Sequence, residues 1–145
     1  MPGASITGSE VAPGPVTSTR ERRRRGSSSR SFLSSVMDSA AADMHIRFTS
    51  RLPGAQIGLT NRYRDQHGWI VAAEIILATA DSTGRPLPPA LISGIARHEV
   101  GHALGLGHAS DGATLMFPES RTTSITAVDR ATLHLLYTLP PGSLR

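Results

Sequence analysis

The spacing of apolar residues divides much of the chain into strand-like and helix-like stretches. Residues 44–49 alternate between apolar and polar side chains, and residues 69–79 form an almost continuous apolar run, so we expect two strands. Glycine, proline and asparagine interrupt residues 51–68, which we interpret as a loop that has room for a short strand at residues 57–60. Apolar residues recur near the helical period after residue 88 and again after residue 126, which predicts two helices. Thr126 and Asp129 predict a capping box at the start of the second helix, with aspartate in place of the usual glutamate.

Residues 1–30 lack this patterning. They are rich in serine, threonine, glycine, proline and arginine and carry almost no large apolar side chain, so we expect a disordered tail. A short helix at residues 32–42 would follow it, with apolar side chains on one face. The chain is therefore interpreted as a tail, residues 1–30, and a single folded domain, residues 31–145.

The net charge of +4 belongs to that tail rather than to the domain. All 15 basic residues are arginines, and the segment 20–30 carries a net charge of +5 whereas the rest of the chain carries −1. A nucleic-acid-binding domain should carry its basic patch on the folded part, so nucleic acid is not the expected partner. An arginine-rich nucleic-acid-binding protein that uses residues 20–30 is one alternative interpretation.

Two absences narrow the function further. The chain has no cysteine, which excludes disulfides and zinc sites built on thiolates. No apolar run approaches the roughly 20 residues of a membrane span, so no membrane partner is expected. Residues 31–37 are too polar and too short for the apolar core of a secretory signal, and no signal peptide is visible in this chain.

The chemistry is concentrated in the first predicted helix, which carries His98, Glu99 and His102 and is followed by Gly105 and His108. Side chains four residues apart project from the same face of a helix, so His98 and His102 can both reach one zinc ion at about 2.0–2.1 Å. A glycine can end the helix in the left-handed conformation, after which the chain can turn and bring back His108 as third ligand. Three protein ligands leave a position for water, which is typical of catalytic zinc.

These five positions match the His-Glu-x-x-His-x-x-Gly-x-x-His signature, and the chain here resembles the metzincin metalloproteases. Residues 115–118, Leu-Met-Phe-Pro, resemble the methionine turn of that clan, and their spacing and wording are similar to the matrixin branch. The resemblance covers about residues 42–137. It implies that Met116 shapes the floor under the metal and that Phe117 and Pro118 line the wall of the pocket for the substrate residue after the cut.

The resemblance implies an α+β fold: a twisted mixed sheet over the active-site helix, with a C-terminal helix, and with the first strands and helix of a matrixin missing. By position, residues 69–79 resemble the edge strand over the zinc cleft, although an ordinary core strand is the alternative. Asp65 and His67 are similar to part of a second, structural zinc site whose other histidines are missing here. Ser120 stands where matrixins carry a tyrosine of the pocket wall.

We therefore predict a zinc-dependent endopeptidase with one catalytic zinc ion on His98, His102 and His108. Glu99 is the expected general base, which takes a proton from the attacking water. The expected partner is a peptide or protein substrate, and the resemblance implies a secreted protein. Besides the nucleic-acid-binding alternative, the chain could be a non-catalytic zinc-binding remnant of such a domain.

Overall fold

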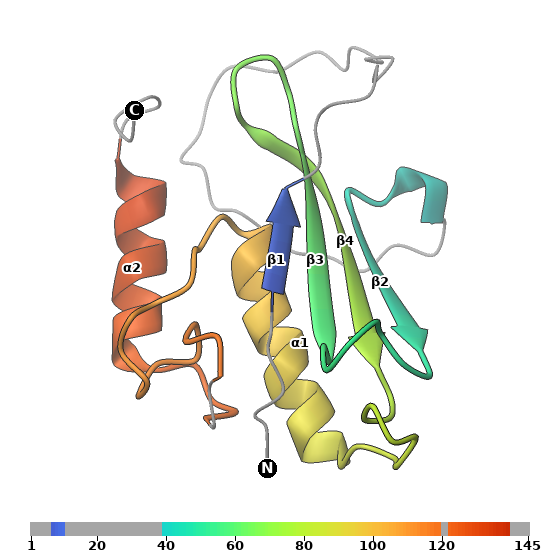
Figure 1. The fold of residues 1–145 in the computed structure, drawn as a ribbon. Helices are drawn as coiled ribbons and strands as arrows, with labels where there is room; N and C mark the ends of the chain where they lie inside the picture. The colour runs from blue at the N-terminus through green and yellow to red at the C-terminus, as the bar shows by residue number, and fades with distance from the viewer. Residues whose placement is uncertain (1–6, 11–38, 120–121, 140–145) are drawn as a thin grey trace.

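The computed structural model describes residues 7–10, 39–119 and 122–139. Along the chain they form a sheet strand, a short 3-10 turn, three more strands and two helices (Figure 1). The elements are β1 (Thr7–Glu10), η1 (Ser39–Ala41), β2 (Met44–Thr49), β3 (Gly58–Arg64), β4 (Ile70–Ala78), α1 (Pro89–Ala103) and α2 (Ala127–Thr138). Of the short helix expected at residues 32–42, the described residues contain only η1.

The four strands form one mixed sheet in the order β1-β3-β4-β2. β2 runs parallel to β4, β3 runs antiparallel to β4, and β1 runs parallel to β3. β4 therefore lies inside the sheet, and the prediction of an edge strand at residues 69–79 is wrong. The alternative of a core strand is confirmed, because a strand paired on both sides and buried by a helix is almost uniformly apolar.

The prediction of a loop at residues 51–68 needs correction at β3, which begins within the short strand suggested at residues 57–60 and continues to Arg64. Gly58, Asn61 and the two arginines of β3 are unusual in a strand, and single-sequence propensity does not favour one here. The strand is stabilised instead by its pairing with β4, which runs from Gly58 opposite Leu77 to Arg64 opposite Ile70. The glycine turn that precedes it, Gly54 with φ of 66°, is loop as expected.

The short strand β1 also departs from expectation. Its four residues pair with β3 from Thr7 opposite Leu59 to Glu10 opposite Arg62. The prediction of a disordered tail over residues 1–30 is therefore wrong for residues 7–10. The physical reason is that β3 offers a row of backbone N–H and C=O groups on the side away from β4, and an extended segment of polar residues can satisfy them. Residues 1–6 and 11–30 lie outside the described residues.

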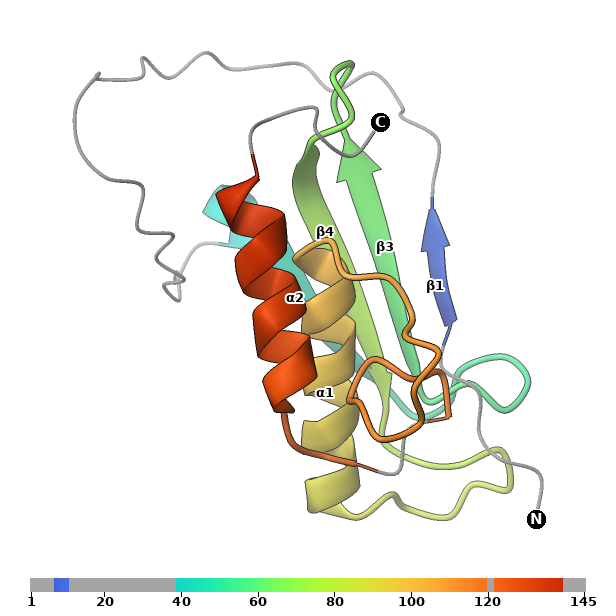
Figure 2. The ribbon, with the colours of Figure 1, turned by 90° about the vertical axis from the view of Figure 1, so that its left-hand side faces the viewer.

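Helix α1 covers the sheet over β3 and β4 and forms the core with them (Figures 1 and 2). Pro89 suits the first turn of the helix because proline lacks the N–H that would have no acceptor there. Ile95 and Ala103 of α1 pack against Ile75 and Leu77 of β4 in the buried core. The α+β fold, with a mixed sheet over the helix that carries the histidine motif, is confirmed.

Helix α2 lies beside α1, on the opposite side of α1 from the sheet (Figure 2). Thr126 and Asp129 form the predicted capping box at its start, each side chain accepting a hydrogen bond from the other's backbone N–H. At its other end the Tyr137 hydroxyl donates to the carbonyl of Leu104, at 3.2 Å, just after α1 ends. In the described part of the chain, neither helix is long and apolar enough to cross a membrane.

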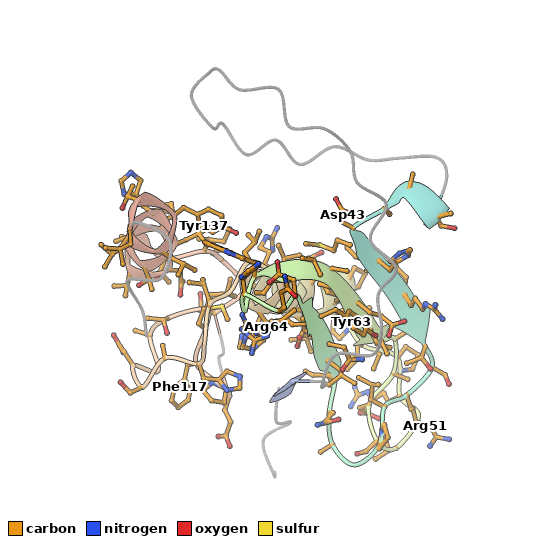
Figure 3. All side chains as sticks on the ribbon, turned by 90° about the horizontal axis from the view of Figure 1, so that it is seen from above. Asp43, Arg51, Tyr63, Arg64, Phe117 and Tyr137 are labelled. Atoms are coloured by element: carbon orange, nitrogen blue, oxygen red, sulfur yellow. The ribbon has the colours of Figure 1, made fainter. Side chains whose placement is uncertain are left out.

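The far edge of the sheet is less well covered. Ile46 and Phe48 of β2 lie opposite Ile75 and Leu77 in a parallel ladder, so they share the face on which α1 packs. They are nevertheless 48% and 64% exposed, because α1 covers β3 and β4 and leaves β2 open. Viewed from above, α2 and Phe117 lie on one side of the molecule, and Asp43 and Arg51, which flank β2, lie towards the other (Figure 3).

Candidate metal centre

Helix α1 and the turn after it place the three predicted histidines. His98 and His102 lie one turn apart on α1 and are both buried. The helix ends at Ala103, two residues before Gly105, whose φ of 103° only glycine adopts readily, and the Leu106 N–H donates back to the Gly101 carbonyl at 2.9 Å. The chain therefore reverses direction at the predicted position, and three residues later His108 stands beside His102.

The three imidazoles converge. One nitrogen from each of His98, His102 and His108 lies within 4.8 Å of the other two, and the Nε2 atoms of His102 and His108 are 3.2 Å apart. Two nitrogen ligands about 2.0–2.1 Å from one tetrahedral ion lie roughly 3.3 Å apart, so this spacing suits zinc. Among the described residues, no second group of three or more histidine, aspartate or glutamate side chains converges in this way.

Two backbone carbonyls fix which nitrogen of each helical histidine is free. His98 Nδ1 donates to the carbonyl of Leu115 at 2.7 Å, and His102 Nδ1 donates to the carbonyl of Leu106 at 2.9 Å. Because a carbonyl only accepts, the proton sits on Nδ1 and the Nε2 lone pair is available. His98 Nε2 is buried and has no hydrogen-bond partner among the described residues. A buried lone pair without a donor is what a metal ligand looks like before the metal binds, so the donor set fits zinc.

The electrostatics favour the neutral form that metal binding requires. The pKa of His102 is lowered to about 4, mainly by burial and in smaller part by the neighbouring histidines and Arg62, against the opposing effect of the Leu106 carbonyl. Burial also lowers the pKa of His98 and of His108 below the ordinary histidine value. All three rings are therefore neutral at pH 7 and available as ligands.

Glu99 is fully buried and turned towards β3 rather than into the histidine group. Its Oε2 accepts a 2.5 Å hydrogen bond from the Thr60 hydroxyl, whereas its Oε1 is buried and has no partner. Burial raises the pKa of the carboxyl to about 7, although the Thr60 hydrogen bond opposes the change. Gly58 makes room for it, because a Cβ atom at that position would clash with Glu99 Oε1 and with Ile95. A carboxyl with this pKa can both accept and return a proton near neutrality.

Met116 packs against α1 at Gly101, and its predicted role as the floor under the metal stays a prediction. It is buried, and its sulfur packs on the bare backbone of Gly101, where a Cβ atom would lie only 2.5 Å from Sδ. Asp129 holds this segment from the other side, because its carboxylate accepts hydrogen bonds from the N–H groups of Leu115 and Met116 at 3.0 and 3.4 Å. The segment that carries the Leu115 carbonyl, the partner of His98, is thus attached to the start of α2.

Sequence reasoning identified the capping box but missed this second role of Asp129, and it missed Thr60 altogether. A buried acidic residue at a helix start is the only local signal for the first. Thr60 lies at the end of the short strand suggested at residues 57–60, and nothing in the sequence indicated that it would face Glu99. Both contacts join residues that are far apart along the chain.

Other predicted residues are less closely tied to the centre. A cavity of about 410 Å³ is lined by His108, Met116, Val128 and Thr132 among others, but not by Phe117 or Pro118. Their role in a specificity pocket stays a prediction, and Ser120 lies outside the described residues. In the β3–β4 turn, Asp65 Oδ1 accepts from the N–H groups of His67 and Trp69, so it serves as a turn residue there.

Comparisons with known proteins agree with this centre. The family model of the matrixin peptidases matches residues 52–138, which include β3, β4, both helices and all three histidines. Metalloendoproteinase 1 of Glycine max is 32% identical over 94 residues, a stretch that covers 61% of this chain. The match takes in 31% of the relative, so the chain corresponds to about a third of that protein's length. No solved structure matches the chain.

The matched family model covers more than half of the chain and includes the elements that form the site. The mixed sheet, the helix with its histidine motif and the buried methionine beneath it are together the expected parts of such a domain. This chain belongs to the matrixin family and carries a metalloprotease-type domain.

Proposed function

We propose that this protein is a zinc-dependent endopeptidase in which His98, His102 and His108 hold one catalytic zinc ion. The observation that carries the proposal is the convergence of three neutral imidazoles, two of them fixed by backbone carbonyls so that Nε2 is free. Zinc bound there would polarise the scissile carbonyl and lower the pKa of a coordinated water towards neutrality.

Glu99 is the proposed general base. It takes a proton from the attacking water and passes it to the leaving amine, which its pKa of about 7 suits. Its free Oε1 is the atom that can accept the proton, while Thr60 holds Oε2. Because the carboxyl is fully buried against β3, it has to turn towards the histidines for water to reach it. Thr60 then acts as a positioning residue that sets how readily Glu99 turns.

The buried shell around the centre holds the ligands in place. Leu106 and Leu115 orient the imidazoles through their carbonyls, and Asp129 anchors the segment that contains Leu115. Such outer-shell partners are usually worth about 10–100-fold in metal affinity or activity. The proposed substrate is a peptide or protein chain, as the family implies. We also propose that the protein is secreted, because the resemblance to the family implies it.

The test is a pair of measurements on the purified chain: bound zinc, and cleavage of casein with and without a chelator. We expect about one zinc per chain and cleavage that stops when the metal is removed. His102→Ala should lose metal and activity together, since two imidazoles hold zinc poorly. Glu99→Ala should keep zinc close to the wild-type content and lose cleavage.

Two outcomes would overturn the proposal. A wild-type chain that binds zinc but cleaves no peptide would be the non-catalytic zinc-binding remnant. A chain that binds no zinc at all, with its fold intact by circular dichroism, would remove the metal site itself. Binding of nucleic acid that disappears when residues 20–30 are deleted would support the remaining alternative, for which the described residues supply no observation.

A further inference from the structure

Three side chains of β3 form a row above α1. Residues 58, 60 and 62 share one face of the strand because side chains alternate with a period of two. Gly58 packs on Ile95 and Glu99, and Thr60 donates to Glu99. Arg62 comes next along the row, before the register shift at the end of β3. One turn further along α1 from Glu99 stands His102, so the row places Arg62 at the edge of the metal centre.

The side chain of Arg62 also contains a donor without an acceptor. The Arg62 Nε atom is buried and has no hydrogen-bond partner among the described residues. A buried N–H of an arginine without an acceptor is costly, so the site favours an acceptor brought by another group.

The side of β3 away from β4 already holds an extended segment. Residues 7–10, with the sequence Thr-Gly-Ser-Glu, pair there in parallel, with Gly8 opposite Thr60 and Glu10 opposite Arg62. This side of the strand therefore accepts a peptide backbone, as exposed strand edges commonly do. The register therefore places an acidic residue of the chain at the position opposite Arg62.

We propose that Arg62 is a specificity-determining residue that selects an acidic side chain in a peptide bound as a strand along β3. A guanidinium offers a planar pair of N–H donors that matches a carboxylate, so the selection is for glutamate or aspartate over neutral and basic residues. The inference rests on the proposed function, whose substrate class it narrows to extended peptides with an acidic residue near the cut.

The experiment compares peptides that carry one glutamate or one lysine at each position in turn of an otherwise identical Gly/Ser/Leu background. For the full-length, zinc-loaded protein, we expect kcat/KM for glutamate to exceed that for lysine by about tenfold or more at one position, because hydrogen bonds between charged groups have that worth. Arg62→Ala should bring the ratio close to one, and Arg62→Glu should reverse it.

Arg62→Gln keeps the length of the side chain and serves if the alanine variant does not fold. The matched control is Arg47→Ala, because Arg47 lies on β2, at the far edge of the sheet, and pairs with Glu74 at 3.1 Å. That variant should keep the wild-type ratio. A purely structural role for Arg62 would change overall activity and leave the ratio as it is.

Peptide binding separates this inference from the proposed function. Fluorescence anisotropy with the full-length Glu99→Ala protein and the labelled glutamate and lysine peptides measures the preference without turnover. A glutamate preference that disappears with Arg62→Ala supports the inference even if the wild-type protein cleaves nothing. Cleavage with a ratio near one at every position, or a ratio that survives Arg62→Ala, overturns the inference and leaves the endopeptidase proposal standing.

Discussion

The two sides of the helix α1 are built in opposite ways. On the side of the metal centre, the buried residues include polar ones, His98, Glu99 and His102, together with Thr60 and Asp129 beside them. On the side of β2, by contrast, large apolar side chains face solvent, with Phe48 the most exposed of them at 64%. Burying polar groups costs free energy, and leaving apolar groups exposed gives up the favourable free energy of their burial. Both sides therefore depart from what stability alone favours.

The difference lies in how the polar groups are satisfied. Around the centre most buried polar side-chain atoms of the described residues have a defined partner, and the three that have none, on Arg62, His98 and Glu99, are the atoms that the two proposals use. The β2 side has no such pattern, and its exposed apolar groups need no partner atom. The centre therefore holds buried polar groups that lower the stability of the fold and that the proposed chemistry requires.

The largest expected effect is at Glu99. Glu99→Gln keeps the shape of the side chain and an acceptor for Thr60 but removes the base, so cleavage should fall by about 10²–10⁴-fold. The free energy of unfolding should stay the same or rise, because a buried carboxyl that is charged above pH 7 is replaced by a neutral amide. The measurements are kcat/KM and urea unfolding, with Glu74→Gln on the outer face of β4 as the control. Equal activity in the two variants would remove the proton-transfer role.

Asp129 gives the next largest effect, on stability. Asp129→Ala removes the helix cap and leaves the N–H groups of Leu115 and Met116 without an acceptor, so the free energy of unfolding should fall by about 2–4 kcal/mol. The matched control is Asp111→Ala, an exposed residue that accepts from the N–H of Ala113. A loss as small as that of the control would mean that the segment holds its place without α2.

The same contact predicts a dependence on pH. Burial raises the pKa of Asp129, but hydrogen bonds from Thr126 and from the backbone of Leu115 and Met116 outweigh it and hold the pKa below the ordinary value of 3.8. A carboxyl with a lowered folded-state pKa stabilises the protein above its unfolded pKa and loses that effect as the pH falls through the folded one. The stability difference between wild type and Asp129→Asn, from urea unfolding, should therefore shrink below about pH 4. A constant difference down to pH 2 would contradict it.

The contact between Gly101 and Met116 should have a smaller effect. Gly101→Ala puts a methyl group against the methionine sulfur, and such overpacking costs about 1–3 kcal/mol, partly offset by about 1 kcal/mol of better helix propensity. We expect a net loss of about 1 kcal/mol and a lower zinc content. Gly107→Ala is the control, since nothing lies within 4 Å of a Cβ there. Stabilisation by Gly101→Ala would show that Met116 can move away freely.

The smallest effect is expected on the β2 side. Phe48→Ser should change the free energy of unfolding by no more than about 0.5 kcal/mol, because the side chain is mostly exposed. Leu77→Ala, at the position opposite Phe48 in the ladder but buried, should cost about 2–5 kcal/mol. If Phe48→Ser costs as much as Leu77→Ala, the β2 side is covered in solution and the contrast between the two sides disappears.

The sequence predicted the parts of this structure that depend on local spacing. His98 and His102 share a helical face, and Gly105 turns the chain at the position where only glycine fits. The capping box at Thr126 follows from the same kind of short-range pattern. Each of these predictions needs no more than about ten residues of chain, which is the range over which backbone geometry is fixed by the sequence itself.

What could not be predicted depends on pairing between distant strands. Residues 69–79 read as a strand, but their apolar pattern does not say whether the strand lies at an edge or inside the sheet. The second half of β3 was missed because its residues are polar, and only the ladder with β4 makes it a strand. The contact of Thr60 with Glu99 and the place of Arg62 were missed too, because both depend on how the sheet packs on α1.

The pairing of β1 with β3 lowers the apparent affinity of any peptide that binds along that strand. Residues 7–10 belong to the same molecule, so they compete at a local concentration that for tethered segments is on the order of millimolar and that dilution cannot lower. An incoming peptide binds only those molecules in which the strand is open, and its apparent affinity falls by that fraction. A measured KM would then reflect competition from β1 of the same molecule as well as recognition of the peptide. Cutting the chain after residue 10 would lower this KM without changing any residue of the centre.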